Sequence, residues 1–175
     1  DPGRGRTKTG YLWAIARDDR PWGGPAPPGV VYSYAPGRGG EHAQACLAGF
    51  SGVLQVDAYA AYNALTDAGN VTLAYCWAHL RRDFFDIAAS GNAPIASEAL
   101  TRIAALYAIE EKIRGLSAEQ RRTVRQAETK PLVDALRIWL EQKLDIVAKR
   151  GRLGEAIRYG LTRWDGFTRF LDDGR

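Results

Sequence analysis

The stretch VLQVDAY, residues 53–59, decides how the first half of the chain is interpreted. Its apolar beginning is typical of a strand, and Asp57 is the last residue of that strand. An acidic residue at the carboxyl end of a strand is often a metal ligand in α/β folds, because the sheet holds the carboxylate rigidly at its edge. Asp is also a favoured N-cap residue, and a helical turn is predicted over residues 58–65. The local pattern taken alone favours the cap.

Further strands are predicted on both sides of this stretch. β-branched and aromatic runs that end in turn signals predict strands over residues 11–17, 30–35, 53–57 and 71–75. The first two are joined by a Gly- and Pro-rich loop and should pair antiparallel. Apolar residues at helical spacing predict a short helix over residues 41–50 and a longer one over residues 76–89.

The rest of the chain is predicted to be helical. Ser117 and Gln120 match a capping box, the reciprocal pair of hydrogen bonds that opens a helix. Pro131 should break or kink the helix that follows, because proline lacks a backbone N–H. A preceding helix over residues 95–114 has one apolar face, formed by Ala99, Ile103, Leu106 and Ile113.

The turn sequence GNAP, residues 91–94, separates two expected regions, residues 1–90 and residues 91–175. The chain has 175 residues, with 24 basic and 20 acidic side chains, so its formal net charge is +4. Residues 1–90 hold 8 basic and 8 acidic side chains, whereas residues 91–175 hold 16 and 12. The basic surplus therefore lies in the helical region, and it permits a nucleic-acid partner without requiring one.

The composition argues against several classes of protein. No apolar run approaches the roughly 20 residues of a membrane span, and the first residues do not resemble a signal peptide. We therefore expect no membrane partner. Two cysteines do not make a disulfide scaffold, so we expect a reducing, cytoplasmic compartment. The chain starts with Asp1 and contains no Met, and we expect it to be a piece of a longer protein.

Few side chains could carry chemistry. Cys76 and His79 lie three residues apart at the start of a predicted helix, and His42 and Cys46 lie four apart on another, so the four could bind zinc. The more ordinary interpretation is that the cysteines are small buried residues and the histidines are polar groups. Basic side chains that could contact phosphate, or could simply be solvated, are Arg4, Arg6, Lys8, Arg81 and Arg82.

Several blocks together resemble insertion-sequence transposases. The predicted order of strand, strand, helix, strand with terminal Asp, strand and helix is that of a ribonuclease-H-like fold lacking its first strand. The whole chain is similar to the central region of the bacterial IS66 family through blocks that occur in the same order, namely PGRGRTKTGYLW (2–13), RDDRP (17–21), GEH (40–42), LAGFSGVLQVDAY (47–59), CWAHLRRDFF (76–85) and RWDGFTRFL (163–171).

The resemblance implies a chemistry. Such transposases use three carboxylates, Asp, Asp and Glu, to hold two divalent metal ions, Mg²⁺ or Mn²⁺, which activate the nucleophile and stabilise the displacement at phosphorus. Asp57 matches the second Asp and would be catalytic and a metal ligand, which reverses the local preference for a cap. Cys76 and His79 match a Cys-x-x-His signature that supports the active site and nearby DNA, and Arg81 and Arg82 follow it.

The chain also departs from the family pattern. The first Asp of the family lies upstream of the block that starts at residue 2, and the final Glu lies shortly after the block FLDDGR, residues 170–175. We therefore expect residues 1–90 to form a partial ribonuclease-H-like core, a mixed sheet without its first strand, and residues 91–175 to be an all-helical insertion. An incomplete sheet should leave an unpaired edge.

The expected protein is a fragment of a DNA transposase. Two of the three catalytic carboxylates would lie outside this chain, so we expect the segment alone to be inactive. The full-length protein would need the divalent metal, bind transposon ends and target DNA, and self-associate in the bacterial cytoplasm. A helical DNA-binding or protein-interaction module without catalysis is the alternative.

Overall fold

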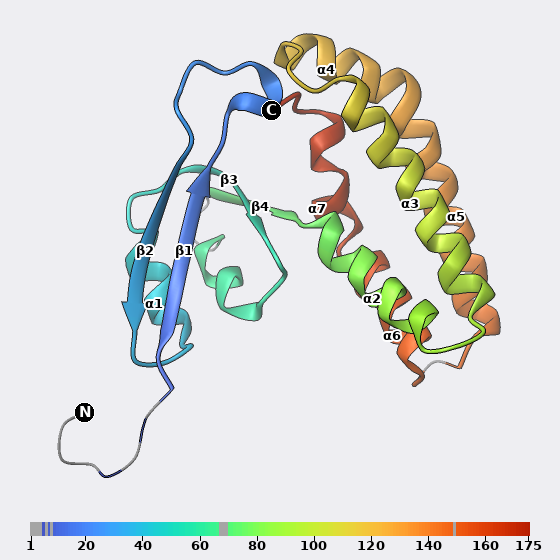
Figure 1. The fold of residues 1–175 in the computed structure, drawn as a ribbon, viewed down its shortest axis with the longest axis horizontal. Helices are drawn as coiled ribbons and strands as arrows, with labels where there is room; N and C mark the ends of the chain where they lie inside the picture. The colour runs from blue at the N-terminus through green and yellow to red at the C-terminus, as the bar shows by residue number, and fades with distance from the viewer. Residues whose placement is uncertain (1–4, 6, 8, 67–69, 149) are drawn as a thin grey trace.

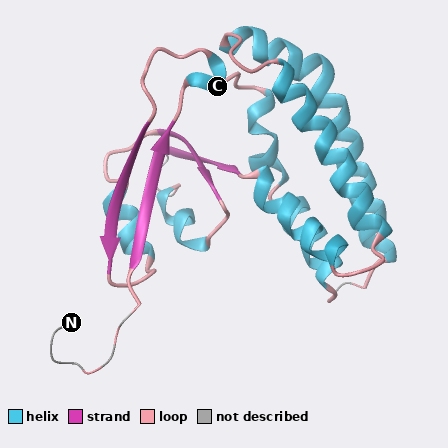
Figure 2. Cartoon of the chain, viewed as in Figure 1, coloured by secondary structure: helices cyan, strands magenta, loops and turns pink. Residues whose placement is uncertain are grey.

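The structure is a computed structural model that describes residues 5, 7, 9–66, 70–148 and 150–175. A region of strands and short helices lies beside a region of longer helices, and the chain passes from the first to the second between β4 (Val71–Tyr75) and α2 (Trp77–Ala89) (Figure 1). Figure 2 shows that all the strands lie in the first of these regions.

The first two strands form a hairpin. β1 (Tyr11–Arg17) and β2 (Gly29–Ala35) pair antiparallel, with Tyr11 opposite Ala35 and Arg17 opposite Gly29. The connecting loop contains a 3₁₀ turn, η1 (Arg20–Trp22), as expected where Pro21 follows two aspartates. Both the strands and their antiparallel pairing are confirmed.

The next two strands run parallel. β3 (Gly52–Val56) pairs with β4 so that Gly52 lies opposite Val71 and Val56 opposite Tyr75. A 3₁₀ helix, η2 (Ala60–Leu65), lies in the connection between them. The helix before β3, α1 (Gly40–Cys46), is shorter than the predicted 41–50, because the N–H of Leu47 closes the last turn and Gly49 turns the chain with a φ of 78°.

The sheet differs from the mixed sheet that was expected. In the described part of the chain the strands form two separate ladders, β1 with β2 and β3 with β4, and no strand pairing joins them. Apolar runs predict that a segment is a strand, but long-range packing decides which strands become neighbours. Each ladder therefore keeps edges without a strand partner, which agrees with the expected incomplete sheet.

Helices make up the second region. The predicted capping box is present, since Ser117 Oγ accepts from the N–H of Gln120 and the Gln120 side chain accepts from the N–H of Ser117. The helix continues through Pro131 without a break. A π-helical turn lies directly before the proline, so the altered hydrogen-bond pattern there accommodates the missing N–H of Pro131. The elements are α3 (Pro94–Lys112), α4 (Ala118–Val124), the π turn η3 (Arg125–Thr129), α5 (Lys130–Ile146), α6 (Arg152–Leu161), α7 (Trp164–Thr168) and η4 (Arg169–Leu171).

Two hydrophobic cores are present and they differ in size. The larger lies among α2, α3, α5, α6 and α7, and its side chains are almost completely buried. The predicted apolar face of α3 (Ala99, Ile103, Leu106) and the adjoining Ile113 are buried as expected. The smaller core lies around β3 and β4 and consists of Leu47, Val56, Leu65, Val71 and Leu73. α2 thus follows a strand of the small core but packs into the large one.

A buried ion cluster holds the end of the chain against the helices. Arg121 and Arg125 are 4% and 3% exposed and share the carboxylate of Glu110, at 3.0 and 2.7 Å. Arg121 also donates to the carbonyl groups of Gly174 and Pro21, the latter in the β1–β2 loop. Burial and the neighbouring Arg125 charge lower the pKa of Arg121.

None of the helices in the described residues is both long enough and apolar enough to span a membrane.

Candidate active site

Parallel pairing brings Asp57 and Cys76 to the same edge. Val56 and Tyr75 are opposite one another at the carboxyl ends of β3 and β4, so the residues that follow them are neighbours. The N–H of Cys76 donates to the carbonyl oxygen of Val56 at 3.0 Å and extends the ladder by one bond. Two blocks that are separate in the sequence thus meet where parallel sheets commonly place functional side chains.

Asp57 is exposed and shapes the turn after β3. Its Oδ1 accepts a hydrogen bond from the N–H of Tyr59 at 3.1 Å, an Asx turn, whereas the N-cap position of η2 is Tyr59 itself. Ala58 has a φ of 65° and is the one non-glycine residue with positive φ among the described residues. Asp57 is therefore not the cap of η2, and it lies beside a locally strained backbone, which is common at functional sites.

Tyr159 of α6 reaches the same edge from the helical region. Its hydroxyl donates to the backbone carbonyl oxygen of Asp57 at 3.1 Å, across 102 residues of sequence. Its ring packs edge-on against Phe167, and the guanidinium of Arg163 lies 4.7 Å from its centre. Burial raises the pKa of Tyr159, and the charges of Asp83 and Asp57 add to that rise while Arg163 opposes it. No local pattern distinguishes this tyrosine, and the sequence analysis missed it.

Aromatic rings connect the hairpin to the turn after Asp57. Trp13 of β1 packs edge-on against Tyr62, and Tyr62 in turn packs edge-on against Tyr59. The Arg38 guanidinium is 4.4 Å from the centre of the Tyr59 ring, and the Tyr59 hydroxyl donates to the Arg38 carbonyl oxygen. Burial, followed by the Asp57 charge, raises the pKa of Tyr62. This cluster holds the turn after β3 against the first ladder.

Cys76 and His79 begin α2 beside this edge. Cys76 has an extended backbone as the N-cap residue, and the N–H of His79 donates to its carbonyl oxygen at 3.1 Å. The Nδ1 atom of His79 is buried without a hydrogen-bond partner in the described residues. No three His, Cys, Asp or Glu side chains in that part of the chain gather as a metal cluster. The alternative zinc site with His42 and Cys46 is therefore not formed.

The other predicted contacts lie farther along α2 or outside the described residues. Arg81 is half-buried, with its guanidinium 5.8 Å from the centre of the Phe85 ring, and Arg82 is exposed. Both lie on the turn of α2 that follows His79. The remaining candidates, Arg4, Arg6 and Lys8, lie outside the residues that the structure describes.

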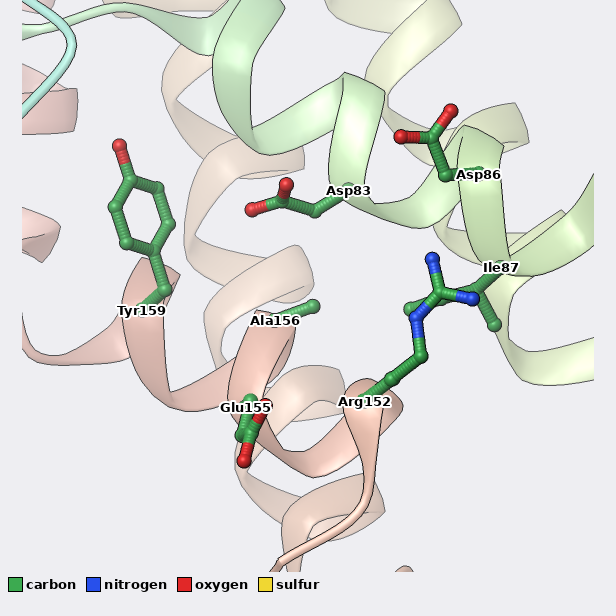
Figure 3. A pocket seen from close by; sticks show the side chains of 7 residues that line it. All are labelled: Asp83, Asp86, Ile87, Arg152, Glu155, Ala156 and Tyr159. Atoms are coloured by element: carbon green, nitrogen blue, oxygen red, sulfur yellow. The ribbon is translucent and has the colours of Figure 1, made fainter.

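A pocket of about 270 Å³ lies between α2 and α6, next to Tyr159 (Figure 3). Asp83 and Asp86 come from α2, and Arg152 and Glu155 from α6. Asp83 is exposed on one side, yet the pocket walls raise its pKa by burial, and the Asp86 charge raises it further. Arg152 and Glu155 lie far from the two aspartates in the sequence, so no local pattern could relate them.

Comparisons with known proteins identify the family of this chain. Residues 1–175 match the IS66 transposase family. The uncharacterized proteins y4qI and y4jD of Sinorhizobium fredii are each 43% identical over 99% of this chain, and y4hP of the same organism is 43% identical over 98%. The chain spans about a third (34–35%) of the length of these relatives. No solved structure matches it significantly. The chain belongs to the IS66 transposase family.

Proposed function

We propose that this chain is the central part of the catalytic domain of a DNA transposase, with Asp57 as one of its metal-binding carboxylates. The observation that carries the proposal is the position of Asp57, exposed at the carboxyl end of β3 and next to the start of α2, in a chain of the IS66 transposase family. A rigid strand end can hold a carboxylate within the small tolerance that phosphoryl transfer requires.

The proposed fold of this domain is ribonuclease-H-like. The order of elements supports it: an antiparallel hairpin, a helix, a strand that ends at Asp57, and a parallel strand followed by a helix. The two separate ladders have unpaired edges, so one further strand between β1 and β3 would join them into a single mixed sheet. We propose such a central strand in the complete domain.

The donor set at Asp57 is compatible with Mg²⁺ or Mn²⁺. Both are hard cations that prefer carboxylate oxygen and water as ligands. Oδ1 of Asp57 is occupied by the N–H of Tyr59, whereas Oδ2 accepts no hydrogen bond from the described residues. Bound divalent metal ions would activate the attacking oxygen and stabilise charge at phosphorus. Asp57 would supply one ligand to them.

The surrounding residues would keep Asp57 in place. Tyr159 holds the Asp57 carbonyl oxygen, and the N–H of Tyr59 fixes one carboxylate oxygen, so the side chain has little freedom to rotate. Cys76 and His79 would support this edge from the start of α2, and Arg81 and Arg82 would contact DNA farther along the helix. The buried His79 Nδ1, for which the described residues offer no hydrogen-bond partner, supports a role for that histidine in the assembled site.

The 175 residues alone should not cut DNA, because one carboxylate cannot hold two metal ions and no three His, Cys, Asp or Glu side chains gather in the described residues. Nicking of plasmid DNA by the purified chain in Mg²⁺ or Mn²⁺, lost in Asp57→Ala, would contradict this statement. In the complete protein we propose transposon ends and target DNA as partners, self-association, and a cytoplasmic location.

A transposition assay in cells tests the proposal. The complete reading frame that contains this segment would be expressed beside a marked element, and the frequency of transposition measured for Asp57→Asn. We expect frequencies at background. The matched control is Asp145→Asn, an exposed change on α5 that should preserve activity. Transposition at the normal frequency by Asp57→Asn would overturn the proposal.

A further inference from the structure

A polar groove runs along β4 on the side that faces α7. It has a volume of about 590 Å³, and its lining comes from η2, β4, α5 and the segment from the end of α6 to η4. Backbone and side chains of β4 form one wall. Polar side chains from three other parts of the chain form the rest, including Asn63, Thr66, Arg137, Thr162, Arg163 and Arg169.

The lining is positively charged. It contains three arginines and one acidic residue, Asp165. Arg137 is paired with Glu141 on α5 at 3.0 Å, which neutralises much of its charge. Arg163 and Arg169 form no ion pair with any carboxylate in the described residues. Two guanidinium charges therefore remain available to a negatively charged ligand.

Both guanidinium groups are held in place by neutral groups. Arg169 donates from Nε to the carbonyl oxygen of Leu73 in β4 at 2.7 Å. Arg163 donates to the Thr162 hydroxyl oxygen at 3.1 Å, and its guanidinium lies over the Tyr159 ring, 4.7 Å from the ring centre. Positioned arginines lose less entropy on binding than free ones, and their planar N–H groups match the oxygens of a phosphate.

We propose that this groove binds the sugar–phosphate backbone of DNA, with Arg163 and Arg169 as phosphate contacts and the Asn63 amide as a weaker one. The proposal rests on the proposed function and names a DNA-binding surface for it. Arg163 packs on Tyr159, whose hydroxyl donates to the backbone carbonyl oxygen of Asp57, so two successive contacts connect the groove to the proposed catalytic edge.

The test is DNA binding by the purified 175-residue chain. Fluorescence anisotropy with duplex oligonucleotides of two unrelated sequences, over a series of salt concentrations, gives the affinity and its salt dependence. Removal of one phosphate contact lowers the slope of log K against log salt by about 0.9, which is roughly eightfold in affinity near 0.1 M salt. We expect Arg163→Gln to show this loss equally on both sequences, and Arg163→Lys to retain most of the binding.

Arg122→Gln is the matched control, because Arg122 is exposed on α4 and does not line the groove. Urea unfolding of each variant identifies changes in stability. Equal binding by Arg163→Gln and Arg122→Gln, or no binding by the unchanged chain at low salt, would overturn the proposal. Either result leaves the role of Asp57 standing, because the transposition assay of Asp57→Asn tests that role separately.

Discussion

The helical region and the strand region are packed to different degrees. Phe84, Ile103 and Ile157 in the helical core are at most 1% exposed, whereas the five core residues around β3 and β4 remain 7–9% exposed. On the hairpin, Leu12 and Tyr34 face each other across the ladder and are 71% and 69% exposed. The strand region carries Asp57 but has the thinner core.

This difference shows a division of roles. The helical region supplies most of the buried apolar surface and hence most of the stability. It also reaches into the strand region through Tyr159, and it holds the β1–β2 loop through Arg121. The candidate site thus depends on a well-packed region outside the ladder that carries Asp57.

The buried ion cluster is one of the two places where the largest effects are expected. Glu110→Ala leaves Arg121 and Arg125 without a carboxylate and should lower the free energy of unfolding by about 3–5 kcal/mol, measured by urea denaturation. Glu111→Ala is the control, because its pair with Arg114 is exposed and should contribute less than about 1 kcal/mol. Similar losses for the two variants would show that the cluster does not hold the helical region together.

The two cores can be compared with one pair of substitutions. Leu80→Ala, in the large core, should cost about 3–5 kcal/mol, and Leu73→Ala, in the small core, about 2–3 kcal/mol. Leu80 is fully buried and contacts α6 at Gly160, so its removal leaves a cavity, whereas the site around Leu73 is open enough to relax. A larger loss for Leu73→Ala would reverse the ranking of the two cores.

The contact between the regions predicts a smaller effect. Tyr159→Phe removes one hydrogen bond to the Asp57 carbonyl oxygen and should cost about 1 kcal/mol. Amide hydrogen exchange should also become faster at the end of β3 while α3 remains protected. Tyr107→Phe, on the exposed surface of α3, serves as the control. Unchanged exchange near Asp57 in Tyr159→Phe would mean that the contact does not position this edge.

The smallest effect depends on pH. The pKa of Asp83 is raised in the folded chain, so its ionisation destabilises the folded state, and this cost appears as the pH rises through that pKa. Asp83→Asn should therefore raise the free energy of unfolding by about 0.3 kcal/mol near neutral pH and leave it unchanged below about pH 3. Asp145→Asn, an exposed change on α5, should have no effect at either pH. Stabilisation by Asp83→Asn that persists in acid would contradict this assignment.

Local features of the fold could be predicted from the sequence, and distant contacts could not. The strand over residues 11–17, the strand over residues 71–75 and the capping box at Ser117 follow from neighbouring residues and occur as predicted. The separation of the two ladders depends on long-range packing.

The same distinction applies to the candidate site. Asp57 was a candidate because it ends a predicted strand, and Cys76 because it begins a helix with His79 three residues on; parallel pairing makes the two residues neighbours. Tyr159 and Arg163 lie about 100 residues away on α6 and the turn after it, and a single helical periodicity does not reveal which strand they contact. Tyr159 and Arg163 belong to the helical region, whose core is the larger and more deeply buried of the two.

Single-turnover cleavage of transposon-end DNA by the purified complete protein tests the role of Asp57 most directly. With Mg²⁺ or Mn²⁺ present, Asp57→Asn should cleave roughly a thousandfold more slowly, because metal stabilisation of the transition state contributes several kcal/mol. Its DNA affinity should stay unchanged, and the Asp145→Asn control should cleave normally. Cleavage by Asp57→Asn within about tenfold of the unchanged protein, a loss of only about 1.4 kcal/mol, would contradict the assignment of Asp57 as a metal-binding carboxylate.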